Sequence, residues 1–132
     1  MRLARGTLIL GAACALGGCG ASNRDQVQAK VEQFVKATAN RDYDTICKQI
    51  LAPSLVLRLS AAGLGCQRAM QVFVGSVQDP TLSIAKITVN GQTASAITLT
   101  SARGQAASLV AIKLLDTGQG WRVSSLGSPA GG

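Results

Sequence analysis

The stretch that decides the fold is residues 82–101, LSIAKITVNGQTASAITLTS, in which two β-branched segments flank Asn90 and Gly91. An Asn-Gly pair between alternating segments is the strongest short-range signal for a β-hairpin, because its two-residue turn needs positive φ at both central positions. We therefore predict that residues 82–89 and 92–101 pair as antiparallel strands, with Asn90 and Gly91 as their turn.

The register of this hairpin follows from pairing Val89 with Gln92. Three apolar pairs then face each other: Ile87 with Ala94, Ile84 with Ile97, and Leu82 with Leu99. The apolar residues change face at the same level in both strands, which predicts a bend or bulge near Ala85 and Lys86. Such a bulge is typical of a strongly curved sheet.

Two more strands are expected after the hairpin. Residues 105–115 are the most apolar segment and are predicted to form a central strand with apolar side chains on both faces: Leu109, Val110, Ile112, Leu114 and Leu115. A turn over residues 116–120 leads to a last strand that begins at Trp121. Residues 127–132 are predicted to form a flexible tail.

Helical spacing dominates before residue 81, beginning with a first helix that ends near Asn40. Ser22 and Asp25 match a capping box ahead of an apolar stripe at Val27, Val31, Phe34 and Val35. Glu32 and Lys36 lie four residues apart on the polar side and are expected to pair.

Two further helices and a short helical piece are expected before the sheet. Asp42 caps a second helix that ends at Pro53, and residues 54–61 add the short piece. The next helix begins near Cys66 and places four residues on one face: Ala69, Met70, Phe73 and Val74. Helices followed by strands predict an α+β fold, with N-terminal helices packed on a curved antiparallel sheet of about four strands.

The first 19 residues have the pattern of an export signal. Arg2 and Arg5 form a basic start, and the uncharged run 6–18 is shorter than the roughly 20 apolar residues that span a bilayer. Its end, Leu16-Gly17-Gly18-Cys19, resembles the bacterial lipobox. By that resemblance residues 1–18 are a lipoprotein signal peptide and Cys19 carries acyl chains such as palmitate. A plain secretory signal is the alternative.

This resemblance implies a place in the cell envelope and a division of the chain. Residues 19–24 would be a lipidated tether, residues 25–126 a single α+β domain, and residues 127–132 the tail. Two or three acyl chains on Cys19 would form a lasting anchor in the membrane. The expected location is the outer side of the cytoplasmic membrane, or the outer membrane of a two-membrane cell.

Two cysteines remain in the mature chain, Cys47 and Cys66. An even pair in an oxidising compartment predicts a disulfide, and two buried free thiols are the alternative. No metal site is expected, because the chain has no histidine and two cysteines do not complete a zinc shell.

Charge and composition limit the partners. Without Arg2 and Arg5, 11 basic residues stand against 6 acidic ones, a net charge of +5. Scattered basic residues, few aromatics and an envelope location argue against nucleic acid. An envelope protein or an anionic wall polymer remains as the candidate partner, beside the membrane itself.

The mature chain resembles the small envelope lipoproteins of high-GC bacteria that carry a cystatin-like cone, in the nuclear-transport-factor-2-like (NTF2-like) or SnoaL-like superfamily. The resemblance spans about residues 25–126. It is carried by Val31, Phe34, Val35, Ala37, Arg41, Asp42, Tyr43, Cys47, Leu51, Pro53, Cys66, Val89, Asn90, Gly91, Gly120, Trp121, Arg122 and Val123. It implies a curved sheet and helices that enclose a cone, in which some members catalyse reactions and others only bind a partner.

The residues favour a protein that is not an enzyme and carries no cofactor. The chain has no histidine, and of its six carboxylates only Asp44 has no predicted cap, turn or pairing role. The preferred hypothesis is a structural or interaction module, and the alternative is binding of a small apolar ligand in the cone. Trp121 is the candidate ligand contact, against a core position beneath the helices.

Overall fold

The computed structural model describes residues 21–129. Four α-helices and one π-helix precede four strands in this part of the chain. The helical elements are α1 (Asn23–Ala39), α2 (Tyr43–Thr45), η1 (Ile46–Ile50), α3 (Pro53–Ala61) and α4 (Cys66–Val74). The strands are β1 (Thr81–Asn90), β2 (Thr93–Ala102), β3 (Gln105–Asp116) and β4 (Trp121–Pro129). The proposed lipobox with Cys19 lies outside the described residues.

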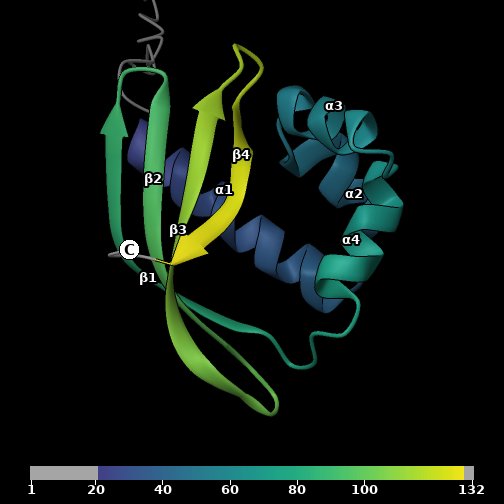
Figure 1. Ribbon diagram of the computed structural model, residues 1–132. Helices are drawn as coiled ribbons and strands as arrows, with labels where there is room; N and C mark the ends of the chain where they lie inside the picture. The colour runs from purple at the N-terminus through teal and green to yellow at the C-terminus, as the bar shows by residue number, and fades with distance from the viewer. Residues whose placement is uncertain (1–20, 130–132) are drawn as a thin grey trace, which may run out of the picture.

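The strands form one antiparallel sheet in the order β1-β2-β3-β4. Helix α1 crosses one face of this sheet, and α2, α3 and α4 lie together beside β4 (Figure 1). The α+β prediction, with helices on a four-stranded antiparallel sheet, is therefore confirmed. The β2–β3 hairpin extends beyond the helices at one end, which leaves that part of the sheet without a helical cover (Figure 1).

The predicted hairpin is present, but its register is wrong. Val89 pairs with Ala94 instead of Gln92, and Ile87 pairs with Ala96 instead of Ala94. The turn consists of Gly91 and Gln92, and Gly91 alone of these two has a positive φ, at 59°. A glycine with positive φ at the first central position is the II′ pattern, so Asn90 stays in the strand.

The predicted bulge lies where it was expected. The pairing of β1 with β2 shifts between Ile84 and Lys86, so Ala85 has no direct partner. Further shifts lie between Thr100 and Ala102 in β2 and near Lys113 in β3. Bulges increase the local twist and bend the sheet, which gives it a hollow face.

The ends of the domain differ from the predicted boundaries. The hydroxyl of Ser22 accepts a hydrogen bond from the Asp25 amide at 3.2 Å, so the cap is confirmed and α1 already begins at Asn23. Residues 23–24 therefore belong to the helix, not to the tether. At the other end β4 continues to Pro129, so residues 127–129 are strand rather than tail. Gly127, with φ 111°, permits the bend that keeps this strand paired.

The second predicted helix begins as expected and then changes its winding. The carboxylate of Asp42 caps it by accepting from the Thr45 amide and hydroxyl, at 3.1 and 2.7 Å. After Thr45 the chain continues as the π-helix η1, whose end packs on the last strand. The Ala52 amide donates to the Val123 carbonyl at 2.7 Å, which ties this end to β4. The two later helices, α3 and α4, are present as predicted.

The core lies between α1, η1, α4 and the end of the sheet that contains Ala94, Leu114 and Trp121. Its largest members are Trp121, Ile46, Ile50, Leu51, Met70, Leu114, Val27, Val31 and Val123. Two predictions about buried faces are wrong. Phe73 is 56% exposed, because α4 turns only Ala69 and Met70 fully inward. Leu109 is 49% exposed, because β3 has strands on both sides but no cover on its outer face.

Candidate functional site

The candidate site is a cavity of about 260 Å³ on the hollow face of the sheet. It lies between the second half of α1, the segment that links α4 to β1, and the ends of β2 and β3 near their turn. Phe34 and Val35 of α1 form one wall, and Val110 and Ile112 of β3 form the opposite one. The cavity runs from the exposed rim residue Gln105 to buried side chains at its base.

Among the described residues that line the cavity, none carries a charge. Most are aliphatic, and the polar ones are hydroxyls and one amide: Thr38, Thr81, Thr100, Ser101, Ser108 and Gln105. The rim hydroxyls are largely paired with each other. Thr81 Oγ1 lies 2.6 Å from Ser101 Oγ, and Thr100 Oγ1 donates to the Ser108 carbonyl at 3.3 Å.

Thr38 differs from these hydroxyls because it has no partner. Its side chain is 8% exposed, and its Oγ1 has no hydrogen-bond partner among the described residues. Thr98, the other buried threonine, donates to the Val110 carbonyl at 3.1 Å. A buried hydroxyl without a partner costs roughly 1–3 kcal/mol of stability. The cavity lining therefore includes a residue whose polar side-chain group has unused hydrogen-bonding capacity.

The segment that links α4 to β1 forms part of the cavity rim and is bonded to the β2–β3 turn. Arg103 in this turn donates its amide to the Gln78 carbonyl at 2.8 Å, and its guanidinium pairs with Asp79. Both members of the ion pair are mostly exposed. Val77 and Pro80 in the same linking segment line the cavity. These contacts hold the linking segment across the cavity mouth.

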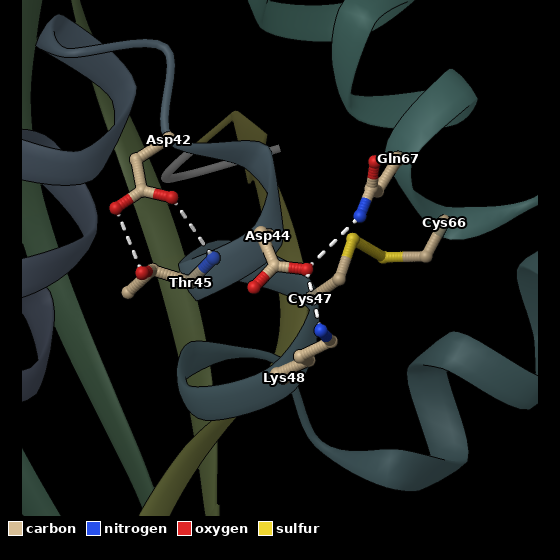
Figure 2. Close-up of polar contacts among 7 residues, drawn as sticks. All are labelled: Asp42, Asp44, Thr45, Cys47, Lys48, Cys66 and Gln67. Carbon is tan, nitrogen blue, oxygen red and sulfur yellow. Dashed lines mark hydrogen bonds and ion pairs between the residues drawn. A yellow bond between two sulfur atoms is a disulfide. The ribbon is translucent and has the colours of Figure 1, made fainter.

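The opposite end of α4 is fixed by a disulfide, as predicted. Cys47 of η1 is bonded to Cys66 at the start of α4, across 19 residues of sequence. Figure 2 shows that Asp44 lies beside this bridge, where it accepts from Gln67 at 3.1 Å and pairs with Lys48 at 2.7 Å. The bridge joins η1 to α4, and the Asp44 contacts join α2 to both of them; Val74, the last residue of α4, lines the cavity.

The other residues singled out in the sequence lie away from the cavity. Trp121 is 2% exposed, so its predicted core position is confirmed, and it is not among the residues that line this cavity. Asp44 is occupied by Lys48 and Gln67, as described above. Glu32 does not pair with Lys36, one turn later on α1, but accepts from Gln28, one turn earlier, at 3.0 Å.

Thr38 is the functional candidate that sequence reasoning missed. A signal for it exists, because residue 38 continues the apolar stripe of α1 that includes Val31, Phe34 and Val35. A hydroxyl at helical spacing on an apolar face is a polar group that the fold must bury.

A second hollow, of about 330 Å³, lies at the other end of the sheet beside the β1–β2 turn. It is slightly larger but is lined mainly by polar, solvent-exposed side chains such as Thr88, Asn90 and Lys113. No unpartnered buried atom faces it among the described residues. The first cavity is therefore the better candidate for a ligand.

Two features are absent from residues 21–129. No three His, Cys, Asp or Glu side chains in this range come together as a group that could hold a metal ion. No helix in this range has the length and apolar character needed to cross a membrane.

The chain was also compared with known proteins. No family model matches it, and no curated protein matches it. Among solved structures it is similar to a proposed dehydratase of the NTF2-like family from Streptomyces avermitilis, at 17% sequence identity and a TM-score of 0.48. The similarity covers 76% of this chain and 90% of that chain. At this level the likeness carries no argument about family or activity.

Proposed function

We propose that this protein is a lipid-anchored envelope lipoprotein with an NTF2-like cone that binds a small, neutral, largely apolar ligand carrying one polar group. The observation that carries this proposal is an uncharged, largely aliphatic cavity whose lining includes Thr38, a residue with a buried and unpartnered hydroxyl. A ligand hydroxyl or carbonyl that reaches Thr38 would use this unsatisfied group. The volume of about 260 Å³ suits a molecule smaller than the drug-sized ligands that fill roughly 300–1,000 Å³.

Binding fits the cavity better than catalysis. General acid–base chemistry needs a titratable group within hydrogen-bond reach of the substrate. The chain has no histidine, and no carboxylate, lysine or cysteine is among the described lining residues. The threonine and serine hydroxyls present have no base beside them to activate a nucleophile. The proposed role is therefore non-catalytic.

The preferred hypothesis from the sequence, an interaction module, remains a second candidate. Leu57 of α3 and Val72 and Phe73 of α4 are 69%, 58% and 56% exposed. Large apolar side chains that protrude from helices are common at protein interfaces. These exposed side chains support a protein partner, and none of them lines the cavity.

The cavity is tested with two small aromatic probes, benzyl alcohol and toluene, by methyl NMR of the Cys19→Ala protein. We expect saturable shifts of the methyl groups of Val35, Val74 and Val110, which line the cavity. Methyl groups of Val27 and Val123 are buried away from it and serve as internal controls.

Two adjacent alanines of β3 provide a matched pair of variants. Ala106 lines the cavity and Ala107, on the other face of the strand, does not. Ala106→Phe should fill the cavity and abolish the shifts, whereas Ala107→Phe should leave them unchanged. Shifts that survive Ala106→Phe, or shifts confined to the methyl groups of Leu57 and Val72, would favour the interaction module instead.

The lipid anchor is tested separately in cells that export the protein. Cys19→Ala should abolish acylation and partitioning into a detergent phase. A variant that still partitions with lipid would contradict the proposed anchor without affecting the cavity.

A further inference from the structure

Two basic side chains meet at the end of η1, far from the cavity lining. Lys30 of α1 donates from Nζ to the Gln49 carbonyl at 3.3 Å, and Arg122 of β4 donates from a guanidinium nitrogen to the Lys48 carbonyl at 2.9 Å. Lys48 and Gln49 are consecutive residues, so their carbonyls bring the ammonium and guanidinium groups into the same small region. Both side chains are half-buried.

No carboxylate neutralises this pair among residues 21–129. The described ion pairs join Lys48 to Asp44 and Arg103 to Asp79, and neither includes Lys30 or Arg122. Lys30 Nζ makes one further contact, to Gln33 Oε1 at 2.9 Å, which is a neutral acceptor. Burial, and then the charge of Arg122, lower the pKa of Lys30. The carbonyl acceptors therefore do not fully compensate the two positive charges.

Both groups keep unused donors. A lysine ammonium has three N–H donors and an arginine guanidinium has five, in a planar fork that suits phosphate oxygens. Arg122 makes one described side-chain hydrogen bond, to Lys48. A third cation reaches the same strand, since Arg58 of α3 donates to the Ser124 carbonyl at 2.7 Å, two residues along β4 from Arg122.

We propose that Lys30 and Arg122 form a binding site for a phosphate group, supplied by a free phosphate ester or by the headgroup of an anionic lipid. An anion between the two side chains relieves their mutual repulsion and accepts hydrogen bonds from both. This site is independent of the proposed cavity ligand, because neither residue lines the cavity.

The test is a titration of the Cys19→Ala protein with inorganic phosphate at constant ionic strength, followed by NMR of the Lys30 and Arg122 side-chain nitrogens. We expect saturable shifts and a rise in the pKa of Lys30 as phosphate binds. Lys30→Met and Arg122→Gln should each weaken phosphate binding at least about tenfold.

Lys86→Met is the control for net charge, because it removes an exposed cation from β1 and lowers the net charge by one, as Lys30→Met and Arg122→Gln do. This variant should change the affinity less than about twofold. Arg122→Lys keeps the charge and should retain part of the affinity, which covers the case in which Arg122→Gln disturbs the fold. Equal losses in Lys86→Met and Lys30→Met, or shifts that never saturate, would overturn the proposal.

Vesicles identify the source of the phosphate. Cosedimentation with phosphatidylglycerol vesicles, compared with phosphatidylcholine vesicles, should depend on Lys30 and Arg122 if the natural anion is a lipid headgroup. Phosphate binding without vesicle binding assigns the site to a soluble phosphate ester. The absence of saturable binding to either would contradict the site.

Discussion

The two ends of the β2–β3 hairpin have the same kinds of residues in opposite settings. At the end near Trp121, which we call the packed end, Ala94 and Ala96 are 6% and 0% exposed beneath the helices. At the end near the turn, which we call the open end, Ala102 and Ala106 line the cavity. Small side chains therefore permit close helix packing at one end and leave space at the other.

This difference comes from what covers the strands and not from the strands themselves. Helix α1 and η1 pack on the packed end, whereas at the open end the second half of α1 only borders the cavity and the tip of the hairpin extends past the helices (Figure 1). Buried polar atoms without a hydrogen-bond partner occur at both ends among the described residues, since Trp121 Nε1 has none at the packed end. Thr98 at the border uses its hydroxyl, and Thr38 opposite the open end does not. The packed end thus supplies stability, and the open end has the features of a binding site.

The largest expected effect is at the packed end. Trp121→Ala should destabilise the protein by about 3–5 kcal/mol in urea unfolding, because it removes the largest buried side chain. Phe73→Ala, at an exposed aromatic residue, is the control and should cost less than about 1 kcal/mol. Similar losses in the two variants would contradict the assignment of Trp121 to the core.

The disulfide should have the next largest effect. Replacing both Cys47 and Cys66 by serine should lower the free energy of unfolding by about 2–5 kcal/mol, since the bridge restricts the unfolded chain. Intact mass should rise by two hydrogens on reduction of the original protein. A native protein that already reacts with thiol reagents before reduction would show that the bridge is not formed.

Gly127 of β4 lies against Val110 of β3, a residue of the cavity wall. Its φ is 111°, and a Cβ placed there would collide with Val110 Cγ1. Gly127→Ala should therefore cost about 2–4 kcal/mol from backbone strain and overpacking. Gly104 also has a positive φ, 75°, but has open space around it, so Gly104→Ala should cost only about 1–2 kcal/mol. Equal costs would mean that Val110 moves aside without penalty.

The smallest effect concerns the exposed cap of α2. Hydrogen bonds from the Thr45 side chain and then its backbone amide hold the pKa of Asp42 below its usual value of 3.8. The folded state therefore binds this proton less readily than the unfolded chain, so the cap stabilises above pH 3.8 and loses its effect as the pH falls further. Asp42→Ala should be less stable than the original protein near pH 7, and the difference should shrink below pH 4. A constant difference would rule out the charged cap.

Local signals explain why the elements could be predicted from the sequence. Ser22 and Asp42 satisfy amides at helix starts, Pro53 fixes its own φ, and Gly91 permits the positive φ of the turn. The hairpin register could not be predicted in this way. Between Lys86 and Asn90 the observed pairing differs from the predicted one by two residues, and a shift of two leaves these side chains on the same face, so their hydrophobic pattern fits both registers. Beyond the bulge the difference is one residue, since Ile84 pairs with Thr98 instead of Ile97.

The site was less predictable because it depends on what lies opposite each residue. The sequence places Thr38 on the apolar face of a helix but does not show that its hydroxyl lacks a partner. Leu109 and Phe73 are apolar residues in periodic segments, and their exposure reflects helices that are absent from their side of the fold. Lys30 and Arg122 are 92 residues apart and meet only through the carbonyls of η1.

The central claim is that the Thr38 hydroxyl recognises the polar group of a ligand in the cavity at the open end. Its most direct test is a cycle of four affinities, for benzyl alcohol and toluene with the Cys19→Ala protein and with its Thr38→Val derivative. Valine keeps the shape of threonine, so the derivative should remain folded and bind toluene at least as well. The account predicts that benzyl alcohol loses about 0.5–1.5 kcal/mol of its advantage over toluene when Thr38 becomes valine. An advantage that is the same in both proteins would contradict it.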